Sequence, residues 1–175
     1  NLEVPSLTTE SSFRKDSVYH TVLRSDIPKY NLPYDDYPDI DGNFFIRNNR
    51  YGNEYAANSE ADYAWVYFAL DAFEDQNDLF EPYVVGAFNK WQIDADSKLE
   101  KDEKTGLWVT EQFLKQGYYN YQYVVKNTKT GKIDPSYVSG SFWQTENQYQ
   151  ALFYYRPWGQ RYDVLMGYGT GNSRR

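Results

Sequence analysis

One segment of the chain, Lys115–Val125, alternates its tyrosines in the manner of a single β-strand that is entered through a glycine turn. Successive side chains of a strand point to opposite faces, so every second residue shares a side. One side would carry Tyr119, Tyr121, Tyr123 and Val125, and the other Tyr118, Asn120, Gln122 and Val124. One of these faces can build a core, and the other meets water or a partner. The segment predicts a β-sandwich that binds or docks rather than a catalytic scaffold.

The composition supports a folded protein that is rich in aromatic residues. Among the 175 residues 19 are tyrosine, and aromatic residues make up 19% of the chain. Tyrosine combines a large ring with a polar tip, which suits strands and contact surfaces. The mean hydropathy of -0.83 is low, but disordered chains are poor in aromatic residues, so we expect a folded chain.

Charge and cysteine content exclude several classes of function. The net charge of -7 disfavours nucleic acid, whose phosphates require Lys and Arg, and it disfavours docking on anionic lipid. The chain has no cysteine, which excludes disulfide bonds and thiolate metal sites. It also has no run of about 18 apolar residues that could cross a membrane as a helix. We therefore expect no nucleic-acid partner and no direct membrane insertion.

The pattern of the chain changes near residue 62. Residues 1–61 hold four of the seven prolines and two short strand candidates, which predicts an N-terminal extended arm or the remainder of a preceding β domain. Residues 62–168 are predicted to form the sandwich, and residues 169–175 a flexible tail. Because the chain begins at Asn1 without Met or a signal peptide, we expect a fragment or a processed product.

Short strands alternate with turns rich in Gly, Asn and Asp from residue 62 onward. Tyr63–Leu70 is apolar on both faces, so both faces are expected to be covered. Further strands are predicted at Pro82–Phe88, in a hairpin over Lys98–Glu111 that turns at Asp102–Gly106, and at Tyr118–Lys126, Asn147–Arg156 and Arg161–Tyr168. This spacing is typical of a sandwich, and we see no amphipathic helix.

No arrangement of residues predicts catalysis, a metal or a cofactor. The single histidine, His20, has no second His or Cys to share a metal, so a structural role is expected. Tyr37–Gly42 resembles a calcium loop, but Tyr37 and Asn48 stand where acidic ligands are required, which favours an ordinary Asp-Gly turn. The acidic segment Asp71–Glu81 is interpreted as a solvated loop, because clustering along a loop does not create opposed catalytic carboxylates. We expect a non-enzymatic protein.

Large aromatic side chains are the best candidates for contact, because such residues commonly anchor interfaces. The candidates are Trp91, Tyr118, Trp143 and Trp158. The ring of Trp91 could stack on a sugar, contact a protein or fill a core. Trp91 together with Trp108 is the alternative platform for stacking a sugar.

Two resemblances carry the functional hypotheses. The first rests on Gly86–Trp91, Gly106–Trp108, Gly117–Tyr123 and Asp134-Pro135, which resemble the early-set, immunoglobulin-like sandwich of glycogen-binding modules over roughly residues 62–156. Sugar-binding members carry a Lys and a second Trp where this chain has Gln122 and Gly131. The resemblance therefore implies the fold more strongly than glycogen binding.

The second resemblance covers nearly the whole chain. An ordered set of motifs resembles the C-terminal region of the plug protein family of the type IX secretion system in Bacteroidota: Asp16–Arg24, Asp39–Gly42, Asp62-Tyr63, Gly86–Trp91, Leu114–Tyr123, Gly140–Phe142, Thr145–Asn147, Tyr154–Arg156 and Arg161–Asp163. This resemblance implies a periplasmic protein, associated with the outer membrane, that closes an outer-membrane translocon barrel by protein–protein contact.

The sequence thus predicts an all-β, immunoglobulin-like (early-set) sandwich with an N-terminal extended arm. Its leading function is that of a secretion-system plug. The alternatives are a carbohydrate-binding module for α-glucans and a purely structural spacer domain. The oligomeric state stays open.

Overall fold

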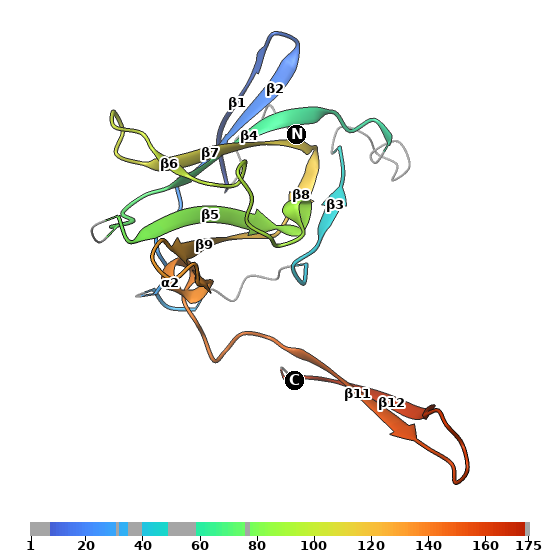
Figure 1. Cartoon of the computed structure of the whole chain (residues 1–175). Helices are drawn as coiled ribbons and strands as arrows, with labels where there is room; N and C mark the ends of the chain where they lie inside the picture. Colours follow the sequence, from blue (N-terminus) through green and yellow to red (C-terminus); the bar gives the residue numbers. More distant parts are fainter. Residues whose placement is uncertain (1–7, 31, 35–39, 49–58, 76–77, 174–175) are drawn as a thin grey trace. The chain divides into compact units, whose positions relative to one another are not determined.

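The computed structural model describes residues 8–30, 32–34, 40–48, 59–75 and 78–173. The chain divides into two compact units, Asn1–Ser141 and Phe142–Arg175. Each unit is described by itself, and Figure 1 shows the order of their elements.

The first unit is a β-sandwich, as the sequence predicts. One sheet has five strands, in the order β1 (Thr9–Lys15), β2 (Val18–Leu23), β4 (Tyr63–Leu70), β7 (Trp108–Lys115) and β6 (Glu100–Lys101). The facing sheet has three, in the order β10 (Ile133–Asp134), β9 (Tyr121–Asn127) and β5 (Phe80–Gly86). A two-stranded ribbon pairs β3 (Phe44–Ile46) with β8 (Gly117–Tyr119), and the short helices are η1 (Ala87–Asn89) and α2 (Ser136–Ser139).

The N-terminal strands belong to the main sheet and do not form a separate arm. β2 runs parallel to β4, with pairs from Tyr19↔Ala64 to Val22↔Tyr67, and β1 adds to its other edge. The boundary between compact units falls after Ser141, whereas the sequence pattern places a domain boundary at residue 62. Parallel strands need a long crossover connection, so their pairing leaves no local turn signal in the sequence.

The core lies between the two sheets. Its fully buried members come from β4, β5, β9 and the segments beside them: Phe68, Leu70, Val84, Leu99, Val125 and Val138. Burying one such aliphatic or aromatic side chain stabilises the fold by about 1.5–3 kcal/mol. The core-facing residues of β4 and of β9 each belong to one of the two alternating sets of their strand, but the sequence does not say which set faces inward.

Two tyrosine side chains of β9 extend through this core, and their hydroxyls form hydrogen bonds at the opposite sheet. The Tyr121 hydroxyl donates to Asp26 Oδ2 over 2.7 Å, and the Tyr123 hydroxyl donates to the Ala69 carbonyl over 3.2 Å. Asp26 is itself fixed beside β4, because its backbone N–H donates to the same Ala69 carbonyl. Buried tyrosines are stable when their polar tips are paired.

The strand predicted over Tyr118–Lys126 is interrupted at Asn120, which separates β8 from β9. The Asn120 side-chain oxygen accepts hydrogen bonds from the backbone N–H groups of Ile40 (3.1 Å) and Gly42 (3.0 Å). Asn120 N–H donates to the carbonyl of Asn43. The amide side chain therefore ties the turn before β3 to the start of β9, and the chain passes from the ribbon to the three-stranded sheet at this residue.

β4 has the predicted bounds, but only its inner face is well covered. Ala64, Phe68 and Leu70 are buried, whereas Tyr63 on the outer face is exposed. The expectation that both faces are covered is therefore only half met.

The second unit is an antiparallel hairpin of β11 (Gln148–Tyr155) and β12 (Val164–Asn172). The sequence pattern assigns these strands to the sandwich and residues 169–175 to a flexible tail. In the structure Gly169, Thr170, Gly171 and Asn172 are paired within β12, so the tail assignment is wrong for them. Glycine is depleted in strands, which hides this strand from pattern analysis.

Titration of the core tyrosines should make the sandwich sensitive to base. Burial, followed by the nearby Asp26 carboxylate, raises the pKa of Tyr121 and Tyr123, and burial raises that of Tyr119 to about 12. A tyrosine in the unfolded chain has a pKa of about 10. The folded state keeps these tyrosines neutral to a higher pH, and this preference stabilises the fold. The stabilisation is complete below the unfolded pKa and is lost as the pH rises through the folded pKa values.

Urea unfolding followed by circular dichroism should therefore show a falling free energy of unfolding above pH ~10. Tyr123→Phe should lower stability by about 1 kcal/mol at neutral pH, because it removes one hydrogen bond, and should flatten the fall at high pH. An unfolding free energy that stays constant into strongly basic solution would contradict this account.

Candidate functional site

The second unit presents large apolar side chains along both strands and at the tip. Trp143 and Trp158 are 90% and 101% exposed. Other exposed side chains on the hairpin are Tyr149, Leu152, Phe153, Tyr154, Tyr155, Tyr162, Leu165, Met166 and Tyr168. Exposed apolar surface of this extent commonly marks an interaction site.

The pairing register sorts these side chains onto two faces. On one face Leu152 stands opposite Tyr168. On the other, Tyr149, Ala151 and Phe153 stand opposite Gly171, Gly169 and Gly167. A Cβ atom added at any of these three glycines would meet nothing within 4 Å, so bare backbone lies open beside the rings. Both faces are therefore available for contact. One of them combines the aromatic rings of β11 with the exposed glycine backbone of β12.

Charge is confined to the ends of the hairpin. β11 and β12 themselves contain no charged residue. Beyond their ends at the tip, Arg156 forms a two-bonded pair with Asp163, with Nε to Oδ1 at 2.8 Å and Nη2 to Oδ2 at 3.0 Å. An isolated two-stranded hairpin is at best marginally stable in water. A partner that covered these neutral strands would stabilise them.

The outer face of the five-stranded sheet carries a second group of rings. Phe13 stacks on His20 with centroids 4.9 Å apart, and the Tyr67 hydroxyl lies 2.9 Å from His20 Nδ1. Phe113 packs between Tyr63 and Trp65 at 5.2 and 5.0 Å. His20 is thus held in a ring stack.

Trp91 is half-exposed and packs against the turn that precedes β3. Its indole N–H donates to the Gly42 carbonyl over 3.2 Å. Asp41 and Gly42 have φ of 53° and 73°, and Asn43 N–H donates to the Ile40 carbonyl, which defines the predicted Asp-Gly turn. The first residues of the calcium-like motif, 37–39, lie outside the described residues. Trp91 therefore has a structural contact and one accessible face.

Trp108, the other candidate for sugar stacking, has different neighbours. Its indole N–H donates to the Phe73 carbonyl over 3.2 Å, and its ring meets the Phe73 ring edge-on at 5.5 Å. It packs against the main core. Trp91 and Trp108 thus serve separate parts of the fold and are not seen as one platform.

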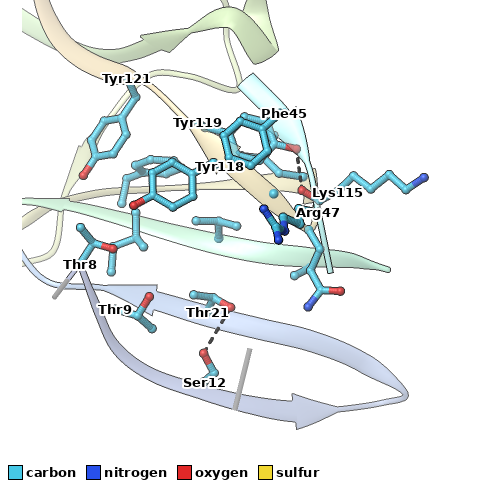
Figure 2. Close-up of a pocket in the computed structure, with 17 residues that line it drawn as sticks. Thr8, Thr9, Ser12, Thr21, Phe45, Arg47, Lys115, Tyr118, Tyr119 and Tyr121 are labelled. Carbon is cyan, nitrogen blue, oxygen red and sulfur yellow. Dashed lines mark hydrogen bonds between the residues drawn. The ribbon is translucent and has the colours of Figure 1, made fainter. Parts of the chain in front are cut away.

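Tyr118 is exposed on β8 and stacks on Phe45 with centroids 5.5 Å apart. Both rings line a cavity of about 430 Å³, shown in Figure 2. The sequence pattern selects Tyr118 but gives no sign of the cavity, since its walls come from strands that are distant in the sequence.

The acidic segment of the first unit has structural contacts. The Asp75 carboxylate accepts from Phe80 N–H, and Glu81 pairs with Lys98 Nζ at 2.6 Å; this hydrogen bond lowers the pKa of Glu81. Across the part of the chain that the structure describes, no three acidic, His or Cys side chains are grouped to hold a metal. Within the same ranges no helix is long and apolar enough to span a membrane.

Comparison with known proteins finds a likeness to a solved structure. No protein-family model matches the chain, and no curated protein matches it. The crystal structure of a hypothetical protein from Parabacteroides merdae ATCC 43184 is similar, with 31% identity and a TM-score of 0.77 over 98% of this chain. The alignment covers 42% of that protein, so this chain spans less than half of its length. The likeness supports the fold.

The contact between Trp91 and Gly42 can be tested with two matched glycines. Gly42 and Gly106 have nearly equal φ of 73° and 75°, but a Cβ at Gly42 would lie 3.1 Å from the Trp91 ring, whereas one at Gly106 would meet nothing within 4 Å. Gly106→Ala should cost about 1 kcal/mol from backbone strain alone. Gly42→Ala should cost about 2 kcal/mol, because the Trp91 ring must also move.

Urea unfolding of both variants measures these costs, and acrylamide quenching of tryptophan fluorescence reports the displaced ring. Equal costs for the two substitutions would show that Trp91 does not pack tightly on the turn.

Proposed function

We propose that the chain is a non-enzymatic component of a bacterial protein secretion system, which acts by protein–protein contact to plug an outer-membrane translocon barrel. It would act in the periplasm, in association with the outer membrane. The observation that carries the proposal is the β11–β12 hairpin, whose two faces and tip expose aromatic side chains. The motif resemblance to the type IX plug family supports the choice of partner.

The hairpin has the chemistry of a protein-binding element. Aromatic residues dominate the binding energy of many interfaces, and charged residues are depleted at interface centres. Trp158 at the tip and Phe153 on the strand are large and exposed, and the strands between the ends are uncharged. Covering such a surface removes apolar area from water without separating ion pairs.

The other two functions have less support from these contacts. A sugar platform would need Trp91 and Trp108 to share a surface, and their rings have separate structural neighbours. A passive spacer gives no reason for the exposed rings of the hairpin.

The proposal is tested by binding of the purified chain to a purified type IX translocon barrel in detergent, measured by biolayer interferometry. Trp158→Ser and Phe153→Ser should each weaken binding at least about tenfold, since both remove large interface rings. Tyr118→Ser tests the most exposed candidate in the first unit.

Ile133→Ser serves as the control, because Ile133 is an exposed apolar residue on β10 of the first unit. Its affinity should match the wild type. No saturable binding of the wild-type chain would overturn the proposal. Equal loss in Ile133→Ser and the hairpin variants would show that general stickiness, rather than the hairpin, accounts for the signal.

A further inference from the structure

The cavity of the first unit lies against the inner face of the five-stranded sheet and beside the β3–β8 ribbon. Its floor is apolar and is formed by Ala64, Val66 and Phe68 of β4 and by Leu114 of β7. Val66 faces inward on a central strand yet is only partly buried, because the cavity reaches it. A pocket of about 430 Å³ falls in the size range of sites for small molecules.

The two walls of the cavity differ in chemistry. Figure 2 shows hydroxyl-bearing side chains of Thr8, Thr9, Ser12 and Thr21 on one side, and the rings of Phe45, Tyr118 and Tyr119 on the other. The Ser12 hydroxyl donates to Thr21 Oγ1 over 3.4 Å, and the Tyr119 hydroxyl donates to the Lys115 carbonyl. A ligand would therefore meet an apolar floor, a ring wall and a polar wall.

The lining is positively charged within an acidic protein. It contains Arg47 and Lys115 and no Asp or Glu, although the chain carries a net charge of -7. The Lys115 ammonium points away from the other lining side chains in Figure 2, so Arg47 supplies the charge of the cavity. Arg47 is held beside the end of β7, because its backbone N–H donates to the Gln116 carbonyl over 3.0 Å. Among the described residues, no carboxylate forms an ion pair with the Arg47 guanidinium. The charge at the cavity mouth is thus available to an anion.

We propose that this cavity binds a small amphipathic carboxylate, with its apolar body against β4 and β7 and its carboxylate at Arg47. An arginine recognises a carboxylate through two parallel hydrogen bonds. An aliphatic or aromatic body that covers the apolar floor removes apolar surface from water, which favours binding. All of the lining residues belong to the first unit, and the inference does not depend on the proposed plug function.

Octanoate is the probe, and 1-octanol is its neutral counterpart with the same apolar chain. Isothermal titration of the full chain should give saturable binding of octanoate with one site, and octanol should bind at least about tenfold more weakly, because it lacks the charge-assisted hydrogen bonds. Higher salt should weaken octanoate binding and leave octanol unchanged. Equal affinity for the two probes, or no saturable heat at millimolar octanoate, would overturn the proposal.

Variants locate the site. Arg47→Gln should weaken octanoate binding about tenfold, and Arg47→Lys should retain part of it. Lys104→Gln removes the same unit of charge from the exposed Asp102–Gly106 turn and should have no effect. Val66→Phe fills the floor and should abolish binding, with circular dichroism and thermal unfolding confirming the fold. Octanoate binding that survives in a folded Val66→Phe protein would place the probe elsewhere and refute the assignment.

Discussion

The sandwich depends on two tyrosine hydroxyls that reach across its core. Tyr121 and Tyr123 project from β9 and donate to Asp26 and to the Ala69 carbonyl on the facing sheet. These bonds satisfy the polar tips of rings that otherwise pack among apolar side chains, and an unpaired buried hydroxyl would oppose folding. They also fix which stretch of β4 lies opposite β9. Phe68 of β4 packs against Tyr121, and both residues line the cavity.

Local patterns predicted the strands well and their pairing poorly. Alternation gave the bounds of β4 and placed Tyr121, Tyr123 and Val125 of β9 on one face, and the Asp102–Gly106 turn is confirmed by Gly106 N–H donating to the Asp102 carbonyl. It did not say which face of β9 points inward. The parallel contact of β2 with β4 and the β3–β8 ribbon join segments far apart in the sequence. No periodicity within a segment encodes such a contact. The break at Asn120 was also missed, since its cause is a side-chain bond to a distant turn.

The structure places the candidate contact residues in different surroundings, which the sequence does not reveal. Trp143 and Trp158 are exposed, as a contact role requires, whereas Trp108 is paired with Phe73 against the core and Trp91 is held on Gly42. Sequence shows that a ring is large but not what it packs against. The alternate glycines Gly167, Gly169 and Gly171 leave open backbone on one face of β12, but glycine is depleted in strands, so they did not mark a strand in the sequence.

Hydrogen exchange of the isolated chain, read by mass spectrometry, tests most directly whether the hairpin is a contact element that awaits its partner. Amides of β4, β5 and β9 should be strongly protected, because they open only with the core. Amides of β11 and β12 should exchange with little protection, because a lone two-stranded hairpin is marginally stable. Hairpin amides protected as strongly as those of β9 in the monomeric chain would contradict the account.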